Sequence, residues 1–198
     1  MRPLGVSFIV LSLWVASWFV AALWSRRTVA RPSFAQNLPN AATTALGAGL
    51  FVFGAEFRFG AFSAGVVHPP LWRLLPAVGW SLTGLVVVGL AFTWWARLTL
   101  GDLWSGNVTR KENHVLIQAG PYRLVRHPIY TGLILALAAV AIQVAMPSTL
   151  LGVVLIAVGF WLKARLEEGF LVAAVGEAAY ADFRRTTPML IPFWPRAG

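Results

Sequence analysis

Two short segments in the second half of the chain concentrate the side chains that could bind or transform a ligand. The first, Gly120-Pro-Tyr-Arg-Leu-Val-Arg-His-Pro-Ile-Tyr130, places two arginines, a histidine and two tyrosines directly before an apolar run. Guanidinium groups bind carboxylates and phosphates, and histidine is the usual proton carrier near neutral pH. A basic, aromatic anchor at a membrane surface is the alternative, but it needs fewer hydrogen-bonding groups. We therefore interpret this segment as part of a ligand site.

The second segment, Lys163-Ala-Arg165-Leu-Glu167-Glu168, follows another apolar run, and Tyr180 lies a little further on. On a helix Lys163 can pair with Glu167 and Arg165 with Glu168, each pair contributing roughly 0.2 to 0.5 kcal/mol. Such pairs are also typical of a solvated helix end. Adjacent glutamates folded against the arginine and histidine segment could instead hold a cofactor that carries both an ammonium and a carboxylate.

The composition indicates that a lipid bilayer surrounds most of the chain. Of its 198 residues 58% are apolar and 12% charged, and the mean hydropathy is +0.71. A soluble domain of this size cannot enclose so much apolar surface. The ten tryptophans lie mostly toward the ends of apolar runs, where amphipathic rings suit the headgroup layer.

Charge and residue usage exclude several classes of site. The net charge of +9 is scattered over short loops, which favours anionic lipid headgroups and an anionic cofactor over nucleic acid. The sequence has no cysteine, so disulfides, thiolate metal sites and a cysteine nucleophile are excluded. No spacing of His, Asp and Glu resembles a metal site, and we expect none.

Four apolar runs have the length of membrane-spanning helices, roughly 17 to 25 residues, and a fifth is slightly shorter. They are residues 4–24, 40–57, 74–96, 129–146 and 148–163. We predict an all-α integral membrane protein without a Rossmann domain, in which the first run is a retained helix and the last continues beyond the bilayer. Met146, Pro147 and Ser148 form the only link between the last two runs. They predict a tight hairpin that brings the two polar segments together.

Positive residues lie unevenly on the two sides of these runs. Only Arg2, Arg58 and Arg73 of the sixteen lysines and arginines share the side of the first residue. By the positive-inside rule the N-terminus faces outward, and residues 97–128 and the C-terminal tail face the cytoplasm. We expect the inner or plasma membrane of a bacterium. We divide the chain into a three-helix membrane region, residues 1–96, and a site-bearing region, residues 97–198.

The small residues in the second apolar run allow two interpretations, a nucleotide-binding turn and a helix-packing face. Gly47, Gly49 and Gly54 resemble the glycine-rich turn of nucleotide-binding folds, but that turn needs a strand before it and a helix after it. Both flanks here predict membrane helix. Ala41, Ala45 and Gly49 recur at every fourth position, which predicts a face for close helix packing.

From Leu98 to Phe193 the chain resembles the isoprenylcysteine carboxyl methyltransferase family and its phospholipid methyltransferase relatives. The segments that carry the resemblance are Leu100-Gly-Asp-Leu-Trp104-Ser105, Gly120-Pro-Tyr-Arg123, Arg126-His127-Pro128 with Tyr130, Glu167-Glu168, Gly176-Glu177 with Tyr180, and the proline-rich end from Pro188 to Pro195. The resemblance implies a membrane enzyme that uses S-adenosylmethionine without a soluble Rossmann fold.

The resemblance also implies which residues form the site. The expected cofactor-binding residues are Tyr122, Arg126, His127, Pro128, Tyr130, Glu167, Glu168 and Tyr180. The expected catalytic residues are Arg126, His127, Arg165 and Glu168. In this scheme Arg126 or His127 binds the cofactor carboxylate, and Glu167 or Glu168 binds its ribose hydroxyls or ammonium. Arg165 and Arg123 steer an anionic acceptor.

The sequence leaves the acceptor and some rival functions open. A carboxylate acceptor needs no general base, whereas a thiol or amine would need His127 or a glutamate. We expect a lipophilic or lipid-anchored acceptor that arrives from the bilayer. The alternatives are a lipid-amine N-methyltransferase, an NADPH-dependent membrane reductase and a non-catalytic membrane subunit.

Overall fold

The computed structural model describes residues 2–21, 28–30, 32–59, 68–101, 110–111 and 116–194. Within them are six α-helices: α1 (Pro3–Ala21), α2 (Phe34–Phe59), α3 (Pro76–Leu100), α4 (Pro128–Val144), α5 (Pro147–Val175) and α6 (Glu177–Thr186). A short 3₁₀ helix, η2 (Gly120–Arg123), precedes α4. The strands β1 (Thr28–Ala30) and β2 (Arg110–Lys111) form a small antiparallel ladder that the sequence did not predict.

The predicted helical membrane fold is confirmed. Helices α1, α2, α3 and α5 are long and apolar enough to cross a bilayer, and α4 is an apolar helix of 17 residues. The protein is therefore a multi-pass integral membrane protein. Helix α5 extends beyond the apolar run to Val175, as predicted. The division of the chain after residue 96 stays a prediction, and it falls within α3.

Helix α2 begins six residues before the apolar run that predicted it, because a capping box starts it. The side chain of Ser33 accepts a hydrogen bond from the backbone N–H of Gln36 at 3.3 Å, and the Gln36 side chain accepts one from the Ser33 N–H at 2.9 Å. Such reciprocal bonds satisfy two N–H groups that a helix start leaves unpaired. Pro39 lies within the second turn of the helix.

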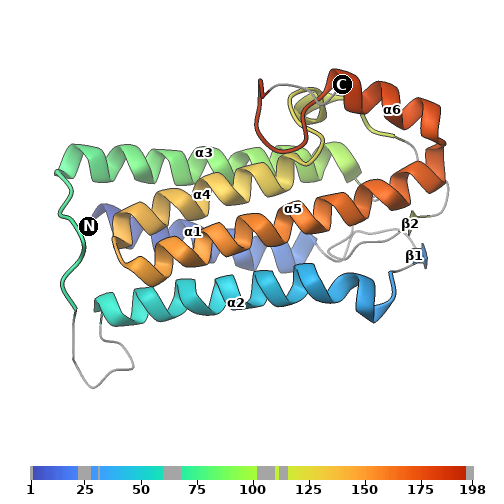
Figure 1. The fold of residues 1–198 in the computed structure, drawn as a ribbon. Coiled ribbons are helices and arrows are strands. Elements are labelled where there is room, and N and C mark those ends of the chain that lie inside the picture. The colour runs from blue at the N-terminus through green and yellow to red at the C-terminus, as the bar shows by residue number, and fades with distance from the viewer. Residues whose placement is uncertain are drawn as a thin grey trace.

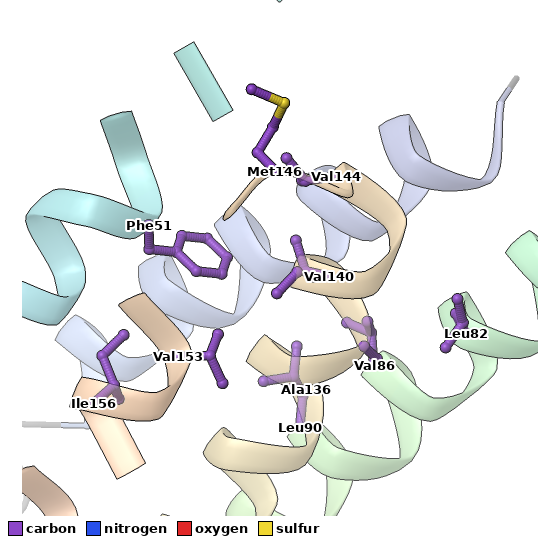
Figure 2. Close-up of a cluster of buried hydrophobic side chains, with 12 residues drawn as sticks. Phe51, Leu82, Val86, Leu90, Ala136, Val140, Val144, Met146, Val153 and Ile156 are labelled. Carbon is purple, nitrogen blue, oxygen red and sulfur yellow. The ribbon is translucent and has the colours of Figure 1, made fainter. Parts of the chain in front are cut away.

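The long helices lie side by side in the order α3, α4, α5 and α2, and α1 packs behind α3 and α4 (Figure 1). Their buried side chains form one apolar core, to which α2, α3, α4 and α5 all contribute (Figure 2). In Figure 2, Val86 of α3 lies near Val140 of α4 and Leu90 lies near Ala136, while Phe51 of α2 lies near Val153 of α5. Most outward side chains are also apolar, as lipid contact requires.

Glycines bring the helix backbones of each outer pair into contact. A Cβ atom added at Gly47 would lie 2.7 Å from the Gly152 carbonyl oxygen, and one added at Gly89 would lie 2.6 Å from that of Gly132. No side chain fits at such distances. Helices α2 and α5 therefore cross at Gly47 and Gly152, and α3 and α4 cross at Gly89 and Gly132.

The predicted packing face of α2 is wrong. Ala41, Ala45 and Gly49 are exposed, and the face against α5 instead includes Gly47 and Gly54. In a membrane helix both faces are apolar, so hydropathy does not indicate which row of small residues is buried. The actual contact face alternates steps of three and four residues, as the 3.6-residue turn requires.

We expect Gly47→Ala to destabilise the protein and Gly49→Ala, two residues away on the same helix, to be neutral or slightly stabilising. The added methyl at position 47 must push α2 from α5, and overpacking of this kind costs about 1 to 3 kcal/mol. The methyl at position 49 meets no atom within 4 Å. Thermal unfolding of both variants in detergent measures the difference, and equal melting temperatures would contradict the crossing at Gly47.

Candidate active site

The predicted hairpin positions the site. Helix α4 ends at Val144 and α5 begins at Pro147, so only Ala145 and Met146 connect them. Ala145 adopts a left-handed conformation with φ of 57°, which reverses the chain within this short link. The start of α4 consequently lies beside the second half of α5. The two polar segments meet there, as the sequence predicted.

Arg126 lies at the centre of this meeting point and is 9% exposed. Its Nε donates to Glu168 Oε1 at 2.9 Å, and its Nη1 donates to the backbone carbonyls of Arg184 and Thr187. One guanidinium therefore joins α5, the end of α6 and the segment after it. The rigid, planar fork of arginine suits such multiple donation, which a lysine ammonium cannot reproduce.

His127 lies between the two glutamates and is 7% exposed. Its Nδ1 is 3.4 Å from Glu167 Oε2, and its Nε2 is 3.3 Å from Glu168 Oε1. Burial alone would lower the pKa of His127, but the two carboxylates more than offset this and raise it above its ordinary value. The imidazole also stacks on Tyr130, with the ring planes 8° apart.

Tyr130 and Lys163 complete this side of the cluster. The Tyr130 hydroxyl donates to Glu167 Oε1 at 2.6 Å, and the Lys163 ammonium lies 5.5 Å from the centroid of the Tyr130 ring. Lys163 also acts electrostatically on Glu167. Pro128 is buried beside them and begins α4, where its missing N–H costs no hydrogen bond.

One predicted ion pair is wrong. Glu168 is bound by Arg126 and His127 and not by Arg165, whose guanidinium lies 5.6 Å from the centroid of the Trp161 ring. Glu168 is buried, whereas Arg165 is exposed. The hairpin therefore gives Glu168 two partners from the segment before α4, in place of Arg165 one turn away on α5.

Two buried tyrosines adjoin the charged cluster. The Tyr180 side chain is 1% exposed, and its hydroxyl makes no hydrogen bond with any described residue. Burial and the nearby Glu168 raise the pKa of Tyr180. Burial and Glu167 likewise raise the pKa of Tyr122, while Arg97 opposes the rise. Both phenols therefore stay neutral, and the Tyr180 hydroxyl is a buried polar group without a partner.

Residues 187–194, which we name the C-terminal strap, run across the start of α4. The backbone N–H groups of Arg126 and His127 donate to the Pro188 and Met189 carbonyls at 2.9 and 3.1 Å, and Thr131 Oγ1 donates to the Leu190 carbonyl at 2.6 Å. Figure 1 shows the strap beside the segment before α4, at the same end of the molecule as α6. The arginine and histidine segment thus holds the strap in place.

A pocket of about 910 Å³ lies between α4, α5 and the strap. Its charged lining comprises Arg126, Arg165, Glu168 and Arg184, which lie at one end. Its apolar lining includes Ile134 and Leu135 of α4 and Trp161 of α5. A volume of this size is typical of a ligand site with a mostly apolar wall and a few polar groups.

Of the residues predicted for the site, three line this pocket: Arg126, Arg165 and Glu168. The others that the structure brings together form the layer behind Arg126 and Glu168, namely Tyr122, His127, Pro128, Tyr130, Glu167 and Tyr180. Arg123 is exposed and is not among the pocket residues. Sequence reasoning missed Arg184 and the strap, because the strap makes its contacts through backbone carbonyls, which carry no side-chain signal.

Comparison with known proteins agrees with this geometry. Residues 82–173, which include both polar segments, match the model of the isoprenylcysteine carboxyl methyltransferase family. The chain is 31% identical over 118 residues to protein-S-isoprenylcysteine O-methyltransferase of Schizosaccharomyces pombe, covering 58% of this chain and 50% of that protein.

A second relative has a different description. The chain is 32% identical over 99 residues to the cobalt-zinc-cadmium resistance protein CzcN of Cupriavidus metallidurans, covering 48% of this chain and 44% of that protein. The chain spans about half the length of both relatives. Within the part that the structure describes, no group of three or more His, Asp or Glu side chains is placed to hold a metal ion. By the family match and the relative from Schizosaccharomyces pombe, the chain is similar to the isoprenylcysteine carboxyl methyltransferase family over about half of its length.

Proposed function

We propose that this protein transfers a methyl group from S-adenosylmethionine to a lipophilic acceptor that enters from the bilayer. The observation that carries the proposal is a pocket with charged groups at one end and an apolar wall along two membrane helices. Three of its four charged residues, Arg126, Arg165 and Glu168, lie within residues 82–173, which match a family of methyltransferases. A pocket of this kind suits one charged and one lipophilic ligand.

The buried residues fit the cofactor chemically. Its amino-acid portion carries an ammonium and a carboxylate, and the pocket offers the Glu168 carboxylate beside the Arg126 guanidinium. Charge-assisted hydrogen bonds of this type are about twice as strong as neutral ones. The buried Tyr180 side chain lies in the layer behind these groups, beside Glu168 and Arg126.

The apolar end of the pocket fits the lipophilic part of the acceptor. Ile134, Leu135 and Ala138 of α4 face Ala157 and Trp161 of α5 across it. Both helices belong to the membrane bundle, so an acceptor dissolved in lipid reaches this wall without crossing water. Arg165 and Arg184 stand at the charged end and favour an acceptor with an anionic group.

The residues of the site act by positioning and by excluding water. S-adenosylmethionine, when bound, supplies an electrophilic methyl group. Arg126 and Glu168 orient the charged part of the cofactor, and the strap covers one side of the pocket. Correct placement of two reactants contributes roughly 7 to 11 kcal/mol to lowering a barrier.

The orientation in the membrane forms part of the proposal. Cationic side chains gather at the end of the bundle that carries the site, among them Arg97, Arg123, Lys163, Arg165 and Arg185. By the positive-inside rule this end faces the cytoplasm. The soluble cofactor would then reach the charged end of the pocket from the cytoplasm.

Calorimetric binding of S-adenosylmethionine and S-adenosylhomocysteine to the detergent-purified protein tests the proposal. We expect saturable binding of both and, at about 100 times Kd, roughly 2.7 kcal/mol of added stability. Glu168→Gln should weaken binding because it removes the carboxylate. Glu177→Gln, at the exposed start of α6, should not. A folded wild-type protein that binds neither compound would refute the proposal, and a lipid-amine product would redirect the choice of acceptor.

A further inference from the structure

We infer that His127 is held as an imidazolium that bridges Glu167 and Glu168, so that it positions the two glutamates and does not act as the general base of methyl transfer. The first part of this inference stands on the geometry of the cluster alone. The second part rests on the proposed function.

The two ring nitrogens of His127 each face a carboxylate oxygen. Nδ1 is 3.4 Å from Glu167 Oε2, and Nε2 is 3.3 Å from Glu168 Oε1. A neutral imidazole has one N–H donor and one nitrogen lone pair. Either neutral tautomer would therefore direct a lone pair at a carboxylate oxygen. Only the imidazolium donates on both sides.

The other hydrogen bonds of the glutamates leave both ionised, so each still needs a donor on the His127 ring. Glu167 Oε1 accepts from the Tyr130 hydroxyl at 2.6 Å, and Glu168 Oε1 accepts from Arg126 Nε at 2.9 Å. Both donors act on carboxylate oxygens and stabilise the ionised form of each glutamate. His127 therefore faces two anions.

Titratable groups on every neighbouring element belong to this environment. They are Glu167, Glu168 and Lys163 of α5, Tyr130 of α4, Tyr122 of η2, Tyr180 of α6, and Arg126 in the segment before α4. Of these, the two glutamates contact the imidazole ring nitrogens. The three phenols act on the glutamates, and Lys163 lies over the Tyr130 ring and acts electrostatically on Glu167.

A protonated histidine cannot accept a proton from the methyl acceptor. The acceptor must therefore be ionised when it binds, as a carboxylate is at neutral pH, or lose its proton to another group or to solvent. In the transfer itself the bond between sulfur and the methyl carbon breaks as the bond to the acceptor forms. The sulfur retains the electron pair, and an anionic acceptor releases no proton.

Histidine NMR tests the protonation state without any activity measurement. The variant His68→Gln with His114→Gln leaves His127 as the one histidine of the chain. In ¹⁵N-histidine-labelled protein in detergent at pH 7.5, about one unit above the ordinary histidine pKa, we expect imidazolium shifts at both nitrogens. A neutral-imidazole pattern in protein that melts like the wild type would overturn the inference.

Two further variants test whether the two glutamates keep His127 protonated. Glu167→Gln and Glu168→Gln in the same background should each shift the His127 titration to lower pH, because each removes one facing anion. Glu177→Gln should leave it unchanged. A titration that responds to none of the three would overturn the bridging role. These outcomes do not depend on whether S-adenosylmethionine binds.

The pH profile of methyl transfer separates positioning from base catalysis. A general base works when unprotonated, so its kcat/KM would rise with pH through the histidine titration. The His127 pKa is raised in the folded protein, so the bridge and its stabilisation are fully present below the ordinary histidine pKa. Both are lost as pH rises through the raised value. We expect kcat/KM to fall over that range, with the midpoint seen by NMR, and a rise would overturn the inference.

Discussion

Arg126→Ala should lose both S-adenosylmethionine binding and much of the stability of the charged cluster. The wild-type guanidinium donates to Glu168 and to the carbonyls of Arg184 and Thr187. Its removal leaves a buried carboxylate with one cation fewer, and breaking a buried pair in this way costs about 3 to 5 kcal/mol of unfolding free energy. The loss of charge-assisted hydrogen bonds to the cofactor adds about 2 to 3 kcal/mol, or roughly 30- to 150-fold in Kd.

The two effects are measured separately, and a nearby arginine provides the control. Thermal unfolding without ligand reports the first effect, and calorimetry with S-adenosylhomocysteine at a temperature where the variant is folded reports the second. Arg123→Ala, three residues earlier, removes an exposed guanidinium and should change neither value by more than about 0.5 kcal/mol. Arg126→Lys should recover little, because one ammonium cannot satisfy Glu168 and two carbonyls. Wild-type affinity in Arg126→Ala would remove this residue from the cofactor site.

The sequence predicted the membrane helices well because their signal is strong and local. Runs of apolar residues must pair their backbone groups internally within a bilayer, and helices do so. The hairpin between α4 and α5 followed from the same reasoning, since so short a link between two spans allows one arrangement. Glu167 and Glu168 therefore meet Arg126 and His127, as the sequence indicated.

The features that the sequence did not predict depend on contacts between distant segments. The apolar surroundings of α2 gave no indication that Gly47, and not Gly49, faces its neighbour. Glu168 takes its partner from another segment of the chain and not from Arg165 on its own helix. The strap contacts the site through carbonyl oxygens, which every residue has. The start of α2 was readable in part, since Ser33 and Gln36 have the spacing of a capping box.

A substitution in the apolar half of the pocket should have the second large effect, a loss of methyl transfer to lipophilic acceptors. Ala157 of α5 lines the pocket opposite α4, and its small side chain leaves room for the acceptor. A phenyl group at this position would occupy that room but would not contact the charged end. We therefore expect Ala157→Phe to lower kcat/KM for a lipophilic acceptor about 100-fold, the scale of loss when a reactant is displaced by about 1 Å. Binding of S-adenosylmethionine should stay within about twofold of wild type.

Val158, the next residue along α5, provides the control for Ala157→Phe. Val158 is exposed on the outer face of α5 and is not a pocket residue, so Val158→Phe adds similar bulk toward lipid without entering the pocket. Assays with a series of lipophilic carboxylates, thiols and amines should show the loss in the first variant only, and chiefly for the longest acceptors, which reach furthest along the apolar wall. Equal losses in both variants would indicate a general disturbance of α5. Full activity in Ala157→Phe would place the acceptor elsewhere, because a filled pocket cannot admit the chain that the proposal assigns to it.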